Sequence, residues 1–122
     1  MLHFLKKTII QMNKASRHSA AGLKVAFQEE FAFQLEVLVS LIALPAAFLL
    51  GQTALERIAL IGSIMLVLIT ELLNSAIETT LNRISLTWNP LTKKAKDISS
   101  AAVFLALINA LIIWVMLIIP HH

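Results

Sequence analysis

Four polar side chains in an otherwise apolar stretch are the strongest chemical signal in the sequence. They are Glu71, Asn74, Ser75 and Glu78. This i, i+3, i+4, i+7 spacing would place them within roughly a 60° arc of one helical face. An ionised carboxylate at membrane depth costs about 3 kcal/mol or more, so two in one span indicate a function. Hydrogen bonding between packed helices is the structural alternative, which we favour for Ser75 but not for the glutamates.

The stretch that holds these residues is one of three that are long enough to cross a bilayer. Of the 122 residues, 58% are hydrophobic and 14% are charged, and the mean hydropathy is +0.83. Soluble domains have about a quarter of their residues charged. Helices over 31–50, 58–81 and 98–119 would each span roughly 30 Å of hydrocarbon. We therefore predict an all-α membrane protein with three transmembrane helices in a single domain, 1–122.

Positive charge predicts the orientation of these spans. Only Arg57 lies between the first and second spans, whereas the other nine cations precede the first span or lie between the second and third. Because positive residues remain inside, the N-terminus is expected in the cytoplasm and the C-terminus in the periplasm.

Segment 3–28 mixes apolar and basic residues, as in an amphipathic helix on the anionic inner leaflet. The net charge of +3 then reflects topology and phosphate binding, and no nucleic-acid partner is predicted.

Acidic and basic side chains are expected to converge at the cytoplasmic interface. Glu78 would lie about one turn from the inner surface and Glu71 roughly 10 Å deeper. Glu30 falls at the depth of Glu78, and Glu36 at that of Glu71. The basic residues before the third span are Lys93, Lys94 and Lys96. Acids for Mg²⁺, cations for phosphates and a base for a hydroxyl are the groups that phosphoryl transfer needs.

Four sequence blocks resemble a known family. They are GLKVAFQEEFAFQLE (22–36), ELLNSAIE (71–78), NRI (82–84) and AKDISSAAV (95–103). Together they resemble the prokaryotic diacylglycerol kinases of the small integral-membrane type. The resemblance implies a homotrimer in the bacterial inner membrane, with three transmembrane helices and a surface helix per subunit. It also implies phosphorylation of a membrane lipid alcohol by ATP and Mg²⁺, at active sites shared between neighbouring subunits.

The same resemblance implies a role for each matching residue. Glu71 would be the catalytic base, and Glu30 and Glu78 would hold the metal. The residues expected at the nucleotide are Glu30, Glu78, Lys96, Asp97, His18, Thr87, Trp88 and Asn89. Those expected at the lipid substrate are Gln11, Ala15, Ser19, Lys24, Ala32, Phe33, Glu36, Glu71, Asn74, Ser100 and Trp114.

Several positions depart from the family pattern. Asn82 stands where an aspartate is common, Gln11 where a basic residue is usual, Ala20 where a tryptophan is common and Gln34 where the family has an arginine. Lys7 or Lys14, one turn from Gln11 on either side, could supply the missing charge there.

Diacylglycerol is the expected acceptor, and phosphatidic acid is then the product. Undecaprenol is the alternative, because relatives with the same motif use that alcohol. From another class, the intramembrane glutamates could serve a small proton or cation channel. The sequence disfavours a channel, because residues 58–69 in the outer half of the second span contain no ionisable group.

Overall fold

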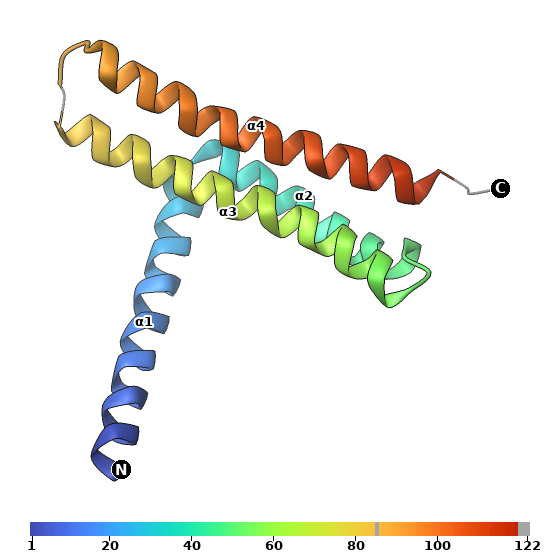
Figure 1. Cartoon of the computed structure of the whole chain (residues 1–122), viewed down its shortest axis with the longest axis horizontal. Coiled ribbons are helices and arrows are strands. Elements are labelled where there is room, and N and C mark those ends of the chain that lie inside the picture. Colours follow the sequence, from blue (N-terminus) through green and yellow to red (C-terminus); the bar gives the residue numbers. More distant parts are fainter. Residues whose placement is uncertain (85, 120–122) are drawn as a thin grey trace.

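The computed structural model describes residues 1–84 and 86–119, which form four helices (Figure 1). These are α1 (Leu2–Glu29), α2 (Phe31–Leu50), α3 (Ala54–Ile84) and α4 (Pro90–Ile118). Helices α2, α3 and α4 are long and apolar enough to cross a membrane. The predicted all-α architecture with three apolar spans is therefore confirmed.

Helix α3 is central, because it packs against both α2 and α4. It also carries the largest group of buried side chains, which are Leu60, Ser63, Ile64, Val67 and Glu71. Helix α1 contacts α2 and projects steeply away from the other three helices (Figure 1). Many large apolar side chains, such as Leu41 and Phe104, remain exposed on the single chain. Such surfaces suit hydrocarbon or a second protein and are unsuited to water.

Helices α3 and α4 are longer than the apolar segments 58–81 and 98–119. The basic residues expected in a link between these spans instead lie on helices, with Arg83 in the last turn of α3 and Lys93, Lys94 and Lys96 near the start of α4. Helix α4 can start early because the Asn89 side chain accepts a hydrogen bond of 2.8 Å from the backbone N–H of Leu91, and Pro90 occupies the first turn. Both features favour a helix N-terminus. The helical register therefore determines where these cations point.

The turn between α2 and α3 is held by side-chain caps. Thr53 Oγ1 accepts a 3.1 Å hydrogen bond from the N–H of Glu56, and Glu56 Oε2 accepts one of 3.0 Å from the N–H of Thr53. This is the reciprocal capping box. Arg57, the one cation between the first two predicted spans, donates from Nε to the carbonyl of Phe48 at 3.1 Å and so caps the end of α2. A Cβ atom at Gly51 would lie 2.5 Å from Cγ of Arg57, so this turn requires glycine.

The corner between α1 and α2 positions Glu30. This residue has extended backbone angles, with φ −105° and ψ 106°, and links the two helices. Gln34, in the first turn of α2, donates from Nε2 to the carbonyl of Phe27 at 2.6 Å. That carbonyl lies in the last turn of α1, where no helical partner is available. Gln34 therefore ties the two helices together on either side of Glu30.

We expect Thr53→Ala to lower the free energy of unfolding by about 1 kcal/mol, because it removes the N-cap of α3. Thr8→Ala is the matched control, since the Thr8 hydroxyl only bonds back to Phe4 within α1. The measurement is the unfolding midpoint in detergent micelles, followed by circular dichroism. Equal losses in the two variants would contradict the capping role of Thr53.

Candidate active site

Four carboxylates predicted to converge are brought together around Glu71. Its side chain is buried, with 6% of the residue exposed. Glu30 and Glu78 both lie close enough to interact electrostatically with Glu71, and Glu71 interacts in the same way with Glu36. Three elements contribute: α3 supplies Glu71 and Glu78, α2 supplies Glu36, and the α1–α2 corner supplies Glu30. We call these four residues the carboxylate cluster.

Two members of the carboxylate cluster retain unused hydrogen-bonding capacity. Glu36 Oε2 is buried and has no hydrogen-bond partner. Among the described residues, none donates a hydrogen bond to the Glu71 carboxylate. Buried acceptors normally have a partner, so an unpaired one indicates a place for a ligand or a proton. Glu36 and Glu71 are thus available to accept a hydrogen bond or a proton from a bound molecule.

Glu78 belongs to a hydrogen-bond chain that links α3 to α4. Asn74 Nδ2 donates to Glu78 Oε1 at 3.3 Å, and the hydroxyl of Ser99 donates to Asn74 Oδ1 at 2.7 Å. The sequence comparison with the family pointed to Ser100, which is exposed, and not to Ser99. The signal for Ser99 was its spacing, since it lies three residues after Lys96 and so shares its helical face.

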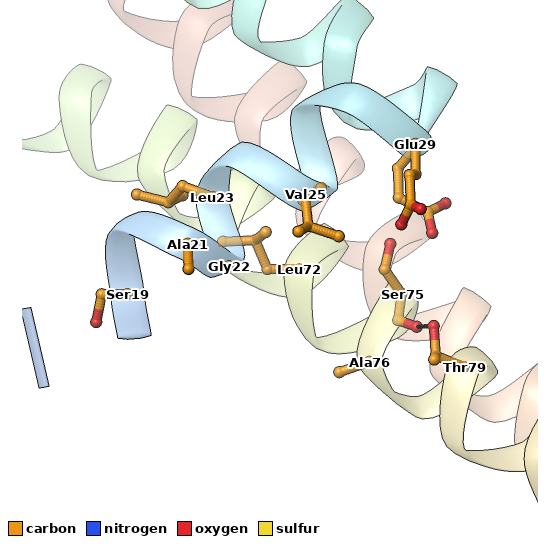
Figure 2. A pocket seen from close by; sticks show the side chains of 12 residues that line it. Ser19, Ala21, Gly22, Leu23, Val25, Glu29, Leu72, Ser75, Ala76 and Thr79 are labelled. Carbon is orange, nitrogen blue, oxygen red and sulfur yellow. Dashed lines mark hydrogen bonds between the residues drawn. The ribbon is translucent and has the colours of Figure 1, made fainter. Parts of the chain in front are cut away.

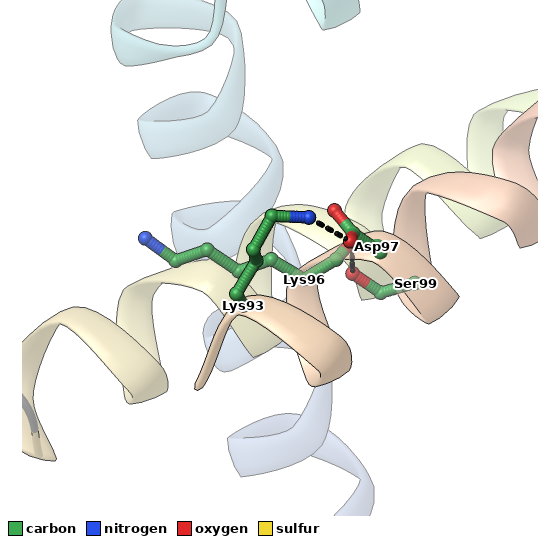
Figure 3. A network of polar contacts seen from close by, with 4 residues as sticks. All are labelled: Lys93, Lys96, Asp97 and Ser99. Atoms are coloured by element: carbon green, nitrogen blue, oxygen red, sulfur yellow. Dashed lines mark hydrogen bonds and ion pairs between the residues drawn. The ribbon is translucent and has the colours of Figure 1, made fainter. Parts of the chain in front are cut away.

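The start of α4 places its charged side chains in two directions. Lys93 Nζ forms an ion pair of 2.6 Å with Asp97 Oδ2, whereas Lys96 extends away from that pair (Figure 3). Lys96 Nζ instead donates to Asn82 Oδ1 at 2.8 Å. Lys96 and Asp97, expected together at the nucleotide, therefore have separate partners in this chain. Because Asn82 is a neutral amide, this hydrogen bond places no negative charge beside Lys96.

A groove lies between α1 and α3 beside the carboxylate cluster (Figure 2). Its volume is about 820 Å³, and it is lined mainly by apolar groups such as Leu23, Val25 and Leu72. Ser19, expected at the lipid, also lines it. Glu30 both lines this groove and interacts with Glu71. The groove therefore connects an apolar surface to the carboxylate cluster.

Other predicted site residues do not join the carboxylate cluster within one chain. Gln11, Ala15 and His18 line a shallow hollow formed by α1 residues only. Thr87, Trp88 and Asn89 are exposed in the α3–α4 connection. The N-terminal half of α1 points away from the other helices (Figure 1), so His18, which is predicted at the nucleotide, is separated in one chain from residues 87–89, which are predicted at the same nucleotide.

The remaining predicted substrate residues have varied surroundings. Lys24, Ala32 and Ser100 are exposed, and Phe33 is buried. Trp114 donates from Nε1 to the hydroxyl of Ser63 at 3.0 Å, so its indole N–H serves the packing of α4 against α3.

The donors of the carboxylate cluster suit a magnesium ion that also binds phosphate. Among the described residues, no group of three or more acidic, histidine or cysteine side chains has the geometry to hold a metal alone. Magnesium is usually bound by one or two carboxylates together with substrate phosphates and water. Glu30 and Glu78, which both lie near Glu71, provide donors of this kind.

The chain is similar to known proteins over most of its length. Residues 17–118 match the family model for prokaryotic diacylglycerol kinase. A diacylglycerol kinase of Pseudomonas aeruginosa is 47% identical over 100 residues, which cover 82% of this chain and 81% of the relative. One from Escherichia coli strain K12 is 44% identical over 108 residues, which cover 88% of each protein. One from Haemophilus influenzae is 44% identical over 100 residues, covering 82% of this chain and 85% of the relative.

The unpaired oxygen of Glu36 predicts that the carboxylate cluster lowers stability. We expect Glu36→Gln to raise the unfolding midpoint by roughly 3–6 °C, about 1 kcal/mol, because it replaces a buried carboxyl oxygen that has no partner with an amide that can donate to a neighbouring carboxylate. The same change at Glu56 should lower the midpoint, since Glu56 Oε2 accepts hydrogen bonds from two backbone N–H groups. Thermal unfolding in micelles measures both, and a fall for Glu36→Gln would contradict the prediction.

Proposed function

This chain belongs to the prokaryotic diacylglycerol kinase family and is a multi-pass membrane diacylglycerol kinase, and we propose that it transfers the phosphoryl group at the carboxylate cluster. As a kinase it uses ATP as the donor. Diacylglycerol carries one free hydroxyl, so the product is phosphatidic acid. The observation that carries the proposal is the meeting of Glu30, Glu36, Glu71 and Glu78 next to an apolar groove.

The acceptor lipid is proposed to lie in the groove between α1 and α3. Apolar side chains such as Leu23 and Leu72 suit acyl chains, and Glu30 marks the polar end of the groove. A lipid in this position would direct its hydroxyl toward Glu71, which lies near Glu30. The unpaired oxygen of Glu36 is available to orient the same hydroxyl. Asn74, which is hydrogen bonded to Glu78 and Ser99, would line this side of the site.

Glu71 is proposed to act as the general base. Its carboxylate accepts the proton of the lipid hydroxyl while the hydroxyl oxygen bonds to the γ-phosphorus of ATP. The bond from that phosphorus to the bridging oxygen breaks, and ADP leaves with the electron pair. The absence of competing donors to Glu71 among the described residues supports this role, as does its burial. Positioned proton transfer of this kind accelerates reactions about 10²- to 10⁴-fold.

The phosphates are proposed to lie between α3 and the start of α4. Glu30 and Glu78 would hold Mg²⁺, which supplies charge neutralisation to the transferring phosphoryl group. Lys96 would contact a phosphate oxygen, exchanging its bond to Asn82 for a stronger charge-assisted one. Asp97 and residues 87–89 would contact the rest of the nucleotide.

A homotrimer with shared active sites is proposed as the functional unit. Its support is the separation, within one chain, of the α1 hollow from the α3–α4 connection (Figure 1). A neighbouring subunit can bring its α1 to the nucleotide and also cover apolar side chains that one chain leaves exposed. The concentration of cations at the α1 and α3–α4 end supports insertion in the bacterial inner membrane with the N-terminus in the cytoplasm and the C-terminus in the periplasm.

The direct test supplies radiolabelled ATP to the purified protein in mixed micelles, with diacylglycerol and undecaprenol offered in parallel. We expect label in phosphatidic acid and a higher kcat/KM for diacylglycerol. A preference for the polyprenol would overturn the acceptor. Proton flux in liposomes without ATP hydrolysis would overturn the kinase assignment of the cluster.

Glu71→Gln is expected to lower kcat by about 10²- to 10⁴-fold, because the amide cannot accept the hydroxyl proton. The oligomer should assemble normally, as measured by size-exclusion chromatography. Glu56→Gln is the control, since Glu56 lies in the α2–α3 turn at the far end of α3, and it should retain kcat. Failure of Glu71→Gln to assemble would instead favour a packing role.

Shared active sites predict crosslinking between subunits. The chain contains no cysteine, so His18→Cys and Trp88→Cys can be prepared in separate chains, one with a size tag, and mixed. We expect a short bismaleimide to join one chain of each kind, because both positions are proposed to face the same nucleotide. A variant that carries both cysteines in one chain is the comparison. Crosslinks that form only within that chain, and never between the two single variants, would contradict sharing.

A further inference from the structure

The hydroxyl of Ser99 connects α4 to the proposed metal site on α3. We infer that Ser99 is a positioning residue, which acts through the Asn74 amide to fix the Glu78 carboxylate for the metal–nucleotide complex. The inference rests on the proposed function, since it requires Glu78 to be a metal ligand. None of the roles predicted for individual residues included Ser99.

The distances determine the direction of the hydrogen bonds. Ser99 Oγ lies 2.7 Å from Asn74 Oδ1 and 3.1 Å from the carbonyl oxygen of Lys96. A hydroxyl has one proton, so the shorter contact takes it. Asn74 then presents its amide NH₂ to Glu78 Oε1, 3.3 Å away. The reverse orientation would place Oδ1 of Asn74 against a carboxylate oxygen that can only accept. The chain therefore holds the amide in one orientation.

Burial makes the Ser99 bond persistent. Only 6% of Ser99 is exposed, so water does not readily compete for its hydroxyl. Without Ser99, the partly buried side-chain carbonyl of Asn74 would have no hydrogen-bond partner, and no interaction would offset the free energy of its desolvation. The Asn74 amide would consequently rotate toward another donor, and Glu78 would lose the hydrogen bond from Asn74 Nδ2.

The same turn of α4 also carries the proposed phosphate-binding lysine. The Lys96 carbonyl is the second acceptor near Ser99, and Lys96 Nζ bonds to Asn82 on α3. Two side-chain hydrogen bonds therefore tie this turn to α3, one at Asn74 and one at Asn82. The Ser99 bond sets the distance between the proposed metal ligand Glu78 and the proposed phosphate ligand Lys96.

Loss of the Ser99 hydroxyl should weaken binding of the metal–nucleotide complex more than it slows the chemical step. Residues that orient a metal ligand typically change metal affinity by 10- to 100-fold, and Ser99 acts one bond further away, so we expect about 3- to 10-fold. With the metal saturating, the geometry at Glu78 is restored and kcat should remain within about twofold of the wild-type value.

The test compares Ser99→Ala with the wild-type protein in micelles. Mn²⁺ and the non-hydrolysable donor β,γ-methylene-ATP are the probes, and electron paramagnetic resonance measures the Kd of Mn²⁺. We expect the Kd to rise about 3- to 10-fold, with a matching rise in the Mg²⁺ concentration that gives half-maximal kinase activity. Alanine is the best helix former and removes one oxygen atom only, so the fold should persist.

Ser63→Ala is the matched control, because Ser63 is a serine that also forms a side-chain hydrogen bond between α3 and α4, with Trp114, away from the proposed metal site. It should leave the Mn²⁺ Kd unchanged. In an Asn74→Leu background, Ser99→Ala should have no further effect, since the two residues act in series. An unchanged Kd in Ser99→Ala, an equal rise in Ser63→Ala, or additive effects with Asn74→Leu would each overturn the inference.

Glu78→Gln separates this inference from the proposed function. If Glu78→Gln weakens Mn²⁺ binding and Ser99→Ala does not, the role of Ser99 alone is wrong. If Glu78→Gln leaves Mn²⁺ binding unchanged, Glu78 is not a metal ligand, and the proposed metal site is wrong together with the role of Ser99.

Discussion

A carboxylate in a membrane-spanning helix must be stabilised by its surroundings or used by a bound molecule. Glu71 is buried on α3, the helix that packs against both α2 and α4, and its neighbours in the carboxylate cluster are also acidic side chains. Hydrocarbon supplies neither water nor counter-ions. We propose that cationic and proton-donating partners come from bound molecules, namely the metal ion and the hydroxyl of the lipid.

This constraint also explains the distribution of charge and length among the helices. Helices α3 and α4 continue past the start of α2 (Figure 1), and their polar ends carry Arg83, Lys93, Lys94 and Lys96. At the opposite end, in the turn between α2 and α3, the side chains of Thr53, Glu56 and Arg57 form hydrogen bonds mainly with backbone groups. One end of the bundle therefore carries the basic residues that are proposed to bind phosphates, while the side chains at the other end stabilise the turn between α2 and α3.

Much of this arrangement follows from the sequence by simple geometry. The first predicted span, 31–50, coincides with α2 (Phe31–Leu50), because the sequence changes from polar to apolar residues at its start and back again after its end. The convergence of Glu30, Glu36, Glu71 and Glu78 follows because adjacent helices run in opposite directions with the same rise per residue. Hydropathy could not reveal the polar ends of α3 and α4, which are helical by virtue of caps and register. The partners of Asp97, Asn74 and Gln34 depend on helix rotation and side-chain reach, which no linear pattern specifies.

Neutral amides occupy two positions at which the resemblance to the family led us to expect charged groups. Gln34 donates to a carbonyl at the end of α1, where an arginine was expected, and Asn82 accepts from Lys96, where an aspartate was expected. An arginine or an aspartate would form the same bonds but would change the charge beside the carboxylate cluster or the lysine. With amides, no carboxylate at position 82 offsets the attraction of Lys96 for the proposed phosphate, and no arginine at position 34 competes with the proposed metal for the Glu30 carboxylate. Hydrogen bonds from Gln34 and to Asn82 thus hold the Glu30 corner and Lys96 without adding a charge beside them.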